Sequence, residues 1–308
     1  MKVTVVNLNP CIDWQLTTPQ FVYGGLNRVT PGKRYAAGKG INVCAALKNL
    51  GHDPLCVGFN YQENGAVITQ ALDDWGVRHD FIMVDGAVRV NIKLYDTTAN
   101  IMTELNQPGA FVPEADISEL CKRIQAIGDG ILVLSGSMPA GVPANIYAKL
   151  CEAWPGVVVV DAEKDALKLA LTSNKPPFCI KPNLFELESS FGVKLSAKEE
   201  IAVFCRELIQ DYGVCIICVS MGADGAMLVT GDEAYYAPVL KLTALGVQGA
   251  GDAMVAGLVY GLKKEESALD LLRMASAAAA ASVIQEGTTM CTYEDFLRFL
   301  DLIVVERM

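Results

Sequence analysis

A glycine-rich segment near the carboxyl end of the chain has the composition of an anion-binding turn. Residues 249–252 read Gly-Ala-Gly-Asp, and a long helical pattern rich in small residues begins there. Glycines allow backbone N–H groups to approach an anion closely, and the amino terminus of a helix adds the positive end of its dipole. An aspartate here can accept the proton of an attacking hydroxyl during phosphoryl transfer. The alternative is a plain turn in which Asp252 caps the helix.

A second glycine-rich segment, residues 36–43, also leads into a helical pattern. It reads Ala-Ala-Gly-Lys-Gly-Ile-Asn-Val. The segment is not a P-loop, because no glycine stands five residues before Gly38 and no serine or threonine follows Lys39. Lys39 can reach a phosphate or sugar oxygen from this position, and the alternative is a lysine in a surface loop.

Four polar stretches stand at the ends of predicted strands. They cover residues 9–13, 135–139, 181–186 and 220–225. In a doubly wound parallel sheet the carboxyl ends of the strands line the ligand crevice. We therefore expect these stretches to converge on one site.

The elements that position these segments alternate between short β-branched runs and helical patterns. This order is typical of a mainly parallel sheet covered by helices on both faces. Strands are predicted at residues 3–7, 55–58, 130–135, 157–161, 179–181 and 215–220. Helices are predicted at residues 40–51, 65–75, 116–127, 144–154, 163–171 and 197–212.

Two regions break this alternation. Residues 13–35 are polar and rich in turn formers, and residues 89–104 alternate apolar and polar side chains like a half-exposed strand. A small sheet over a ligand cleft would account for both, with a surface hairpin as the alternative. We expect a single domain over residues 1–308, with lid segments at about 13–35 and 88–106.

The length, composition and net charge of the chain limit the kinds of ligand that we expect it to bind. The chain has 308 residues, 52% of them hydrophobic, and a net charge of −10. That length suits one large α/β domain with a modest subdomain. Because an acidic chain is repelled by a nucleic-acid backbone, we expect small-molecule ligands held by a few local cations.

The ten cysteines favour buried free thiols in a reducing compartment. Cys215 and Cys218 are the one close pair, but they lie in a strand-like run of a chain with two histidines, which argues against a zinc or redox site. The first residues resemble a strand rather than a signal peptide, and no stretch has the length and hydrophobicity of a membrane span. We expect a cytoplasmic protein without membrane contact.

The order and spacing of these motifs resemble the PfkB family of sugar kinases from residue 2 to about residue 294. The resemblance rests on residues 38–43, 135–137, 181–186 and 249–252. Residues 9–13, 26–28 and 89–93 are similar to the branch that holds 1-phosphofructokinases and tagatose-6-phosphate kinases. The resemblance implies a ribokinase-like α/β fold, a three-layer α/β/α arrangement with a small β-sheet lid, and a homodimer formed through that lid.

The resemblance also implies a reaction and its residues. Asp252 would deprotonate the acceptor hydroxyl as it attacks the γ-phosphate of ATP, with the N–H groups of Gly249, Ala250 and Gly251 as the anion hole. The implied sugar-phosphate site comprises Asp13, Arg28 (from the partner's lid), Gly38, Lys39, Asn42, Arg89 and Ser137. The implied ATP site comprises Lys181, Asn183, Ser220, Gly222 and Gly225. Asn183 and Glu186 would organise Mg²⁺ through water.

We expect D-fructose 1-phosphate as the substrate and the 1,6-bisphosphate as the product. Tagatose 6-phosphate, or another sugar or nucleoside, is the alternative substrate. A non-catalytic sugar-phosphate sensor is a distant alternative, because the base and the anion-hole glycines are present. A dinucleotide-dependent oxidoreductase would need a glycine-rich first strand–helix turn, whereas residues 9–13 read Asn-Pro-Cys-Ile-Asp.

The chain departs from the family pattern at a few positions. Ala37 replaces a glycine before Lys39, Val247 and Gln248 replace the usual Thr-Val or Pro-Val, and Ala253 follows the base in place of serine or threonine. Residues 161–164 read Asp-Ala-Glu-Lys where close relatives have Asp-Thr-Ser-Gly or Asp-Cys-Ser-Gly. These changes bear on the choice of sugar more than on the reaction.

Overall fold

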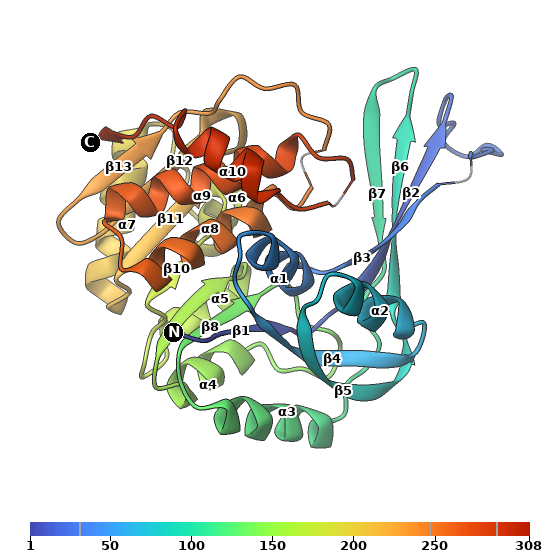
Figure 1. Ribbon diagram of the computed structural model, residues 1–308, viewed down its shortest axis with the longest axis horizontal. Helices are drawn as coiled ribbons and strands as arrows, with labels where there is room; N and C mark the ends of the chain where they lie inside the picture. Colours follow the sequence, from blue (N-terminus) through green and yellow to red (C-terminus); the bar gives the residue numbers. More distant parts are fainter. Residues whose placement is uncertain (31, 247, 288) are drawn as a thin grey trace.

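The computed structural model describes residues 1–30, 32–246, 248–287 and 289–308. Pro31 in the first expected lid segment, Val247 before the expected anion hole, and Thr288 lie outside the described residues. The described chain forms a ten-stranded main sheet and a four-stranded small sheet. Figure 1 shows the small sheet projecting from the body that holds the main sheet.

The main sheet is mainly parallel. Its strands in spatial order are β14 (Glu306–Arg307), β13 (Ala234–Ala237), β12 (Ala226–Val229), β11 (Ile216–Ser220), β10 (Cys179–Ile180), β9 (Val157–Asp161), β8 (Ile131–Ser135), β1 (Val3–Asn7), β4 (Leu55–Glu63) and β5 (Arg78–Ala87). Neighbours from β11 to β5 are parallel, and β12 to β14 are antiparallel. The carboxyl ends of the parallel strands therefore share one edge.

Helices cover both faces of this sheet because its central strands are apolar on both sides. Every residue of β1 and β8 is buried. Figure 1 shows α1 and α2 above β4 and β5, with α3 below them. The helices are α1 (Lys39–Asn49), α2 (Ala66–Asp74), α3 (Glu114–Ile127), α4 (Ile146–Ala153), α5 (Lys164–Leu171), α6 (Leu184–Phe191), α7 (Lys198–Tyr212), α8 (Ala250–Lys264), α9 (Ala268–Val283) and α10 (Tyr293–Leu300).

The two segments expected to form a lid meet in the small sheet. Its strands in spatial order are β3 (Arg34–Ala37), β2 (Cys11–Thr18), β6 (Arg89–Asp96) and β7 (Ile101–Asn106). The alternating segment is antiparallel to β7, as expected, but it is also parallel to β2, so the surface-hairpin alternative is wrong.

The small sheet has one polar and one apolar face. Arg89, Asn91 and Lys93 share a face of β6, and the register places Asp13 beside Asn91 and Glu104 beside Lys93 on that face. The opposite face carries mainly apolar side chains, namely Ile12, Trp14, Leu16, Val90, Ile92, Leu94, Ile101 and Leu105.

The expected α/β fold with a mainly parallel sheet is confirmed, and the six predicted strands are all present. The prediction that the cysteines are free thiols is confirmed for all ten. The prediction that they are buried holds except for Cys215, which is exposed, and Cys121, which is half-buried. No helix in the described ranges is long and apolar enough to cross a membrane.

Candidate active site

The expected anion hole lies at the start of α8. Gly249 is the N-cap in a left-handed conformation, φ 78°, which glycine adopts without the steric cost of a side chain. The alternative that Asp252 is a plain N-cap is therefore wrong. The N–H groups of Ala250, Gly251 and Asp252 precede the first intrahelical hydrogen bond, and within the described residues no side chain caps them. These N–H groups are available to an anion.

Asp252 is buried directly beside these N–H groups. It is 6% exposed, and its Oδ2 accepts a hydrogen bond of 2.7 Å from Nδ2 of Asn42 in the first turn of α1. Burial raises the pKa of Asp252 to about 6, although the charge of Lys39 opposes the shift. A carboxyl group that titrates closer to neutrality than usual is well suited to accept a proton as a general base.

Asp161, at the end of β9, lies between two lysines. Its Oδ2 is 3.2 Å from Lys39 Nζ and its Oδ1 is 3.2 Å from Lys181 Nζ. Ser135 also donates a hydrogen bond of 3.0 Å to Oδ2. Burial would raise the pKa of Asp161, but the two lysines outweigh burial and hold this pKa below its usual value. The three groups therefore form a charged cluster in which Asp161 and Lys181 are buried, while 39% of the Lys39 side chain is exposed.

Lys181 joins this cluster to the anion hole. A Cβ atom placed on Gly251 would lie 3.6 Å from Lys181 Nζ, and one placed on Gly249 would lie 4.0 Å from Asn42 Nδ2. Lys181 is 3% exposed, so its charge acts in a site largely shielded from water. The anion hole thus has a fixed cation on one side and the base with its amide partner on the other.

Asn183 and Glu186 form a capping box at the start of α6. Asn183 Oδ1 accepts a hydrogen bond from the Glu186 N–H at 2.7 Å, and Glu186 Oε2 accepts one from the Asn183 N–H at 2.8 Å. The other carboxylate oxygen of Glu186, Oε1, lies 3.6 Å from Lys39 Nζ. The pair is thus rigidly held, with one oxygen of Glu186 outside the capping box.

A hydrated magnesium ion fits this arrangement better than a directly ligated one. No group of three His, Cys, Asp or Glu side chains in the described part of the chain could hold a metal ion by itself. Mg²⁺ keeps several waters and binds through one or two carboxylates together with substrate phosphates. Glu186 offers one such carboxylate oxygen beside the cavity described next.

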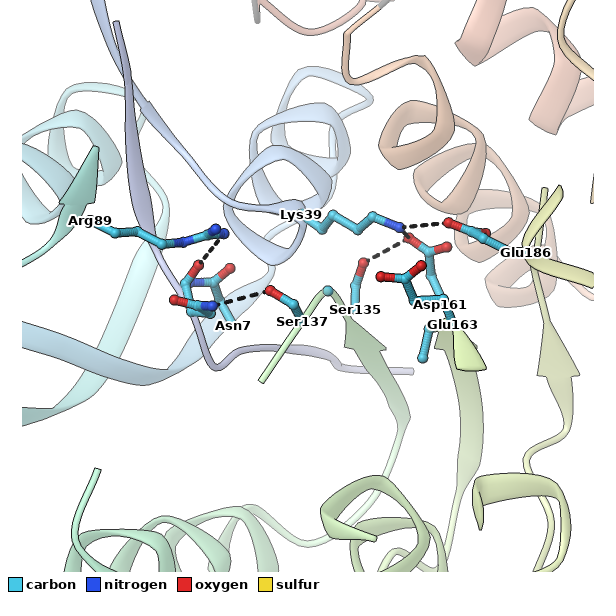
Figure 2. A pocket seen from close by; sticks show the side chains of 11 residues that line it. Asn7, Lys39, Arg89, Ser135, Ser137, Asp161, Glu163 and Glu186 are labelled. Atoms are coloured by element: carbon cyan, nitrogen blue, oxygen red, sulfur yellow. Dashed lines mark hydrogen bonds and ion pairs between the residues drawn. The ribbon is translucent and has the colours of Figure 1, made fainter. Parts of the chain in front are cut away.

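A cavity of about 230 Å³ opens at the carboxyl ends of β1, β8 and β9. Figure 2 shows the Arg89 side chain extending toward Asn7 and Ser137, while Lys39 extends away from Arg89 toward Asp161 and Glu186. Lys39 and Arg89 were both expected to bind the phosphate group of the sugar phosphate. Both line the cavity, but the Lys39 ammonium is paired with carboxylates. The lining residues are Asn7, Asn9, Lys39, Arg89, Ser135, Gly136, Ser137, Asp161, Ala162, Glu163 and Glu186.

The small sheet supplies the cation side of the cavity. The Arg89 guanidinium donates to the backbone oxygens of Asn9 (3.3 Å) and Gln107 (3.2 Å), and its buried Nε has no protein partner within the described residues. Two nitrogens of this group are thus held by the backbone, and the buried Nε–H is left without a partner. Beside it, Asp13 is buried and accepts a hydrogen bond of 3.1 Å from Asn91.

The other expected site residues lie in three places: in or beside the cavity, at the end of β11 and the turn after it, and in the loop between β2 and β3. Ser137 accepts a hydrogen bond from Asn9 in the cavity, and Gly38 packs so close to Asn7 that a Cβ would lie 2.8 Å from its Oδ1. Ser220, at the end of β11, pairs with Asn183 in an isolated bridge. Gly222 and Gly225 follow in a turn with positive φ angles. Arg28 is exposed on the loop between β2 and β3 and is not part of the cavity lining.

Seven cavity residues were not among the expected site residues: Asn7, Asn9, Ser135, Gly136, Asp161, Ala162 and Glu163. Three of them, Asn7, Ser135 and Asp161, are the last residues of parallel strands. The rule that such strand ends line the crevice could have identified them.

The described departures lie close to the site. Ala37 ends β3 of the small sheet and Ala253 lies in the first turn of α8, and both are buried. Ala162 and Glu163 line the cavity, and Lys164 adopts a left-handed conformation with φ 53°. Gln248 donates a hydrogen bond of 3.2 Å from Nε2 to Glu104 on β7.

Known proteins resemble this chain over nearly its whole length. The model of the pfkB family of carbohydrate kinases matches residues 2–295. A 1-phosphofructokinase from Borreliella burgdorferi is 31% identical over 308 residues, covering 99% of this chain and 98% of the relative. The crystal structure of phosphofructokinase-2 from Escherichia coli in complex with potassium superposes with a TM-score of 0.92 at 25% identity, covering 98% of each chain. A ribokinase from Thermotoga maritima has a TM-score of 0.80 at 20% identity, over 98% of this chain and 99% of that one, which shows a shared fold.

Proposed function

The chain belongs to the pfkB family of carbohydrate kinases, and on that premise we propose that it phosphorylates D-fructose 1-phosphate to D-fructose 1,6-bisphosphate with ATP. The observation that carries the proposal is Asp252, buried beside uncapped N–H groups at the start of α8. A base next to an anion hole is the arrangement that phosphoryl transfer to a hydroxyl requires.

In this reaction Asp252 accepts the proton of the acceptor hydroxyl, and Asn42 holds the carboxylate in place through its hydrogen bond. The N–H groups of residues 249–251 stabilise the negative charge that develops on the transferred phosphoryl group. Lys181 adds a positive charge beside Gly251. Magnesium, when bound, would neutralise charge on the ATP phosphates.

The proposed ATP site is formed by the loops that come after β10 and β11. Lys181 and Asn183 precede α6, Ser220 ends β11, and Gly222 and Gly225 form the turn that follows. We propose that magnesium binds beside the Asn183–Glu186 pair through water. The capping box already uses the one side-chain oxygen of Asn183 and one of the two carboxylate oxygens of Glu186.

The proposed sugar-phosphate site faces the small sheet, which we propose acts as a lid. Asp13, Gly38 and Asn42 would bind hydroxyls, and Ser137 lies beside them in the cavity. Arg89 would bind the phosphate already on the sugar, and Lys39 would exchange a carboxylate partner for a phosphate oxygen.

We propose further that two copies pair through this lid, where Arg28 of the partner subunit would approach the phosphate. The support is an exposed set of apolar side chains on the small sheet and its loops, namely Phe21, Val22, Tyr23, Leu26, Val29, Ile101, Met102 and Leu105. Large exposed apolar surfaces often mark protein–protein contacts.

A coupled ADP-release assay tests the function. Fructose 1-phosphate, fructose 6-phosphate, tagatose 6-phosphate, free fructose and a nucleoside are each supplied with ATP and Mg²⁺. We expect the highest kcat/KM with fructose 1-phosphate. A preference for tagatose 6-phosphate would change the substrate but keep the reaction, whereas no turnover with any acceptor would favour a sugar-phosphate sensor.

The pH dependence of kcat/KM should show an acid limb near pH 6. Asp252 acts in its ionised form, so activity falls as pH drops through its pKa of about 6, by about tenfold per unit below it. A base with an ordinary aspartate pKa would leave the profile flat to about pH 5. Because a phosphate monoester also titrates near pH 6, binding of the sugar phosphate to D252N over the same range separates the two titrations.

Replacing Arg89 with alanine should raise KM for the sugar phosphate at least about tenfold, with KM for ATP within about twofold. The reason is the loss of charge-assisted hydrogen bonds to a phosphate, each worth about 1.5–3 kcal/mol. Steady-state kinetics with each substrate varied in turn measure both constants. The matched control is R78A, because Arg78 is exposed on β5 and pairs with Asp53 outside the cavity. Equal increases in the two KM values would assign Arg89 a structural role.

A further inference from the structure

A hydrogen bond links the small sheet to the residue just before the anion hole. Nε2 of Gln248 donates to Oε1 of Glu104 at 3.2 Å. Gln248 is followed directly by Gly249, the left-handed N-cap of α8. A shift of Gln248 is therefore transmitted through one peptide bond to the N–H groups that bind the transferred phosphoryl group.

The carboxylate of Glu104 is itself held in place. Its other oxygen, Oε2, accepts a bond of 2.6 Å from Lys93 Nζ and one of 3.4 Å from Asn106. Lys93 is buried, with 8% of its side chain exposed, and lies on the same face of β6 as Arg89. Lys93 thus fixes Glu104 to the strand that carries the proposed phosphate-binding arginine.

The other end of the Gln248 amide is also confined. Its Oε1 is buried and has no hydrogen-bond partner within the described residues. The side chain is therefore partly buried, although its hydrogen bond to Glu104 is exposed, and this bond crosses from the body to the small sheet.

From these contacts we propose that Gln248 is a positioning residue that couples the small sheet to the anion hole. The hydrogen bond to Glu104 forms when the sheet lies in the position described here, and it then holds Gly249 and the following N–H groups in their phosphoryl-binding geometry. Closure of the sheet over the sugar phosphate would raise the rate of transfer as well as retain the substrate. This inference rests on the proposed kinase function.

The test is a swap of the two interacting side chains. Q248A should lower kcat about five- to tenfold, with both KM values within about twofold, since one hydrogen bond positions a group used in the transition state. Q248E, which sets two carboxylates against each other, should lower kcat further. In Q248E/E104Q, the amide now at position 104 can accept from Lys93 and donate to the carboxylate now at position 248. The kcat of this double variant should therefore recover to within about threefold of wild type.

The matched control is E286Q. Glu286 pairs with Lys33 at 3.2 Å in another contact between the small-sheet segments and the body, but both side chains are largely exposed. We expect its kcat to stay within about twofold of wild type. Thermal melts establish that each variant is folded, and the swap guards against damage caused by either single change.

Three outcomes would overturn the coupling alone: an unchanged kcat in Q248A, no recovery in the swap, or an equal loss in E286Q. An inactive wild-type protein would instead overturn the kinase function, and the coupling with it.

Discussion

Replacing Asp252 with asparagine is expected to lower kcat about a thousandfold while the protein still binds the sugar phosphate. The substitution removes the proton acceptor but almost no volume, and general-base catalysis typically contributes about 10²- to 10⁴-fold. Asn42 can still donate its hydrogen bond to the amide oxygen that replaces Oδ2. Rapid-quench turnover and calorimetric binding of fructose 1-phosphate measure the two effects.

The control for this variant is N42A, which removes the hydrogen bond but leaves the base. We expect a smaller loss of kcat than in D252N, because the carboxylate that accepts the proton is still present. Turnover of D252N within about tenfold of wild type would assign the proton transfer to another group.

The second large effect is expected from Asp161→Asn, which should destabilise the fold by about 3 kcal/mol. The change leaves Lys39 and Lys181 facing a neutral amide, and loss of one partner from a buried ion pair typically costs about 3–5 kcal/mol. Glu186 still pairs with Lys39, which places the expected value at the lower end. Comparison of chemical denaturation midpoints with the wild-type protein measures the change.

Asp53 provides the matched control, since it also contacts two cations. It lies 3.3 Å from Lys48 and 2.9 Å from Arg78, but 58% of its side chain is exposed. Asp53→Asn should therefore cost less than about 1 kcal/mol, because exposed ion pairs are screened by solvent. A similar loss in both variants would show that burial does not govern the energy of the Asp161 cluster.

The sequence was most informative about the centre of the main sheet. The predicted bounds of β1 and β9 match to the residue, since each is a β-branched run flanked by turn or helix signals. The edge strand β5 was missed, because its exposed residues carry charges and a glycine that a single-sequence reading assigns to loops. The hairpin of β12 and β13 was missed for a different reason. These strands are short, and they pair antiparallel at the end of an otherwise parallel pattern.

The sequence predicted many of the residues of the candidate site but not the contacts between them. Glycine spacing located the start of α8, because the need for a left-handed N-cap is local. The pairing of Asp161 with Lys39 and Lys181 could not be predicted, because the two lysines are far apart in the sequence and meet only through the sheet order. The same holds for the bond between Gln248 and Glu104.

The parallel pairing of β2 with β6 joins residues that are 78 positions apart in the chain. We expect the ladder to form after the intervening segment, which includes β4 and β5, has folded onto the main sheet, because that folding shortens the loop that the pairing must close. Amide hydrogens of β2 and β6 should thus exchange with solvent through a local opening that leaves the main sheet protected. Such an opening would separate Asp13 and Arg89 while Asp252 and Lys181 keep their places, so that sugar-phosphate binding is the first property lost and the last gained in folding.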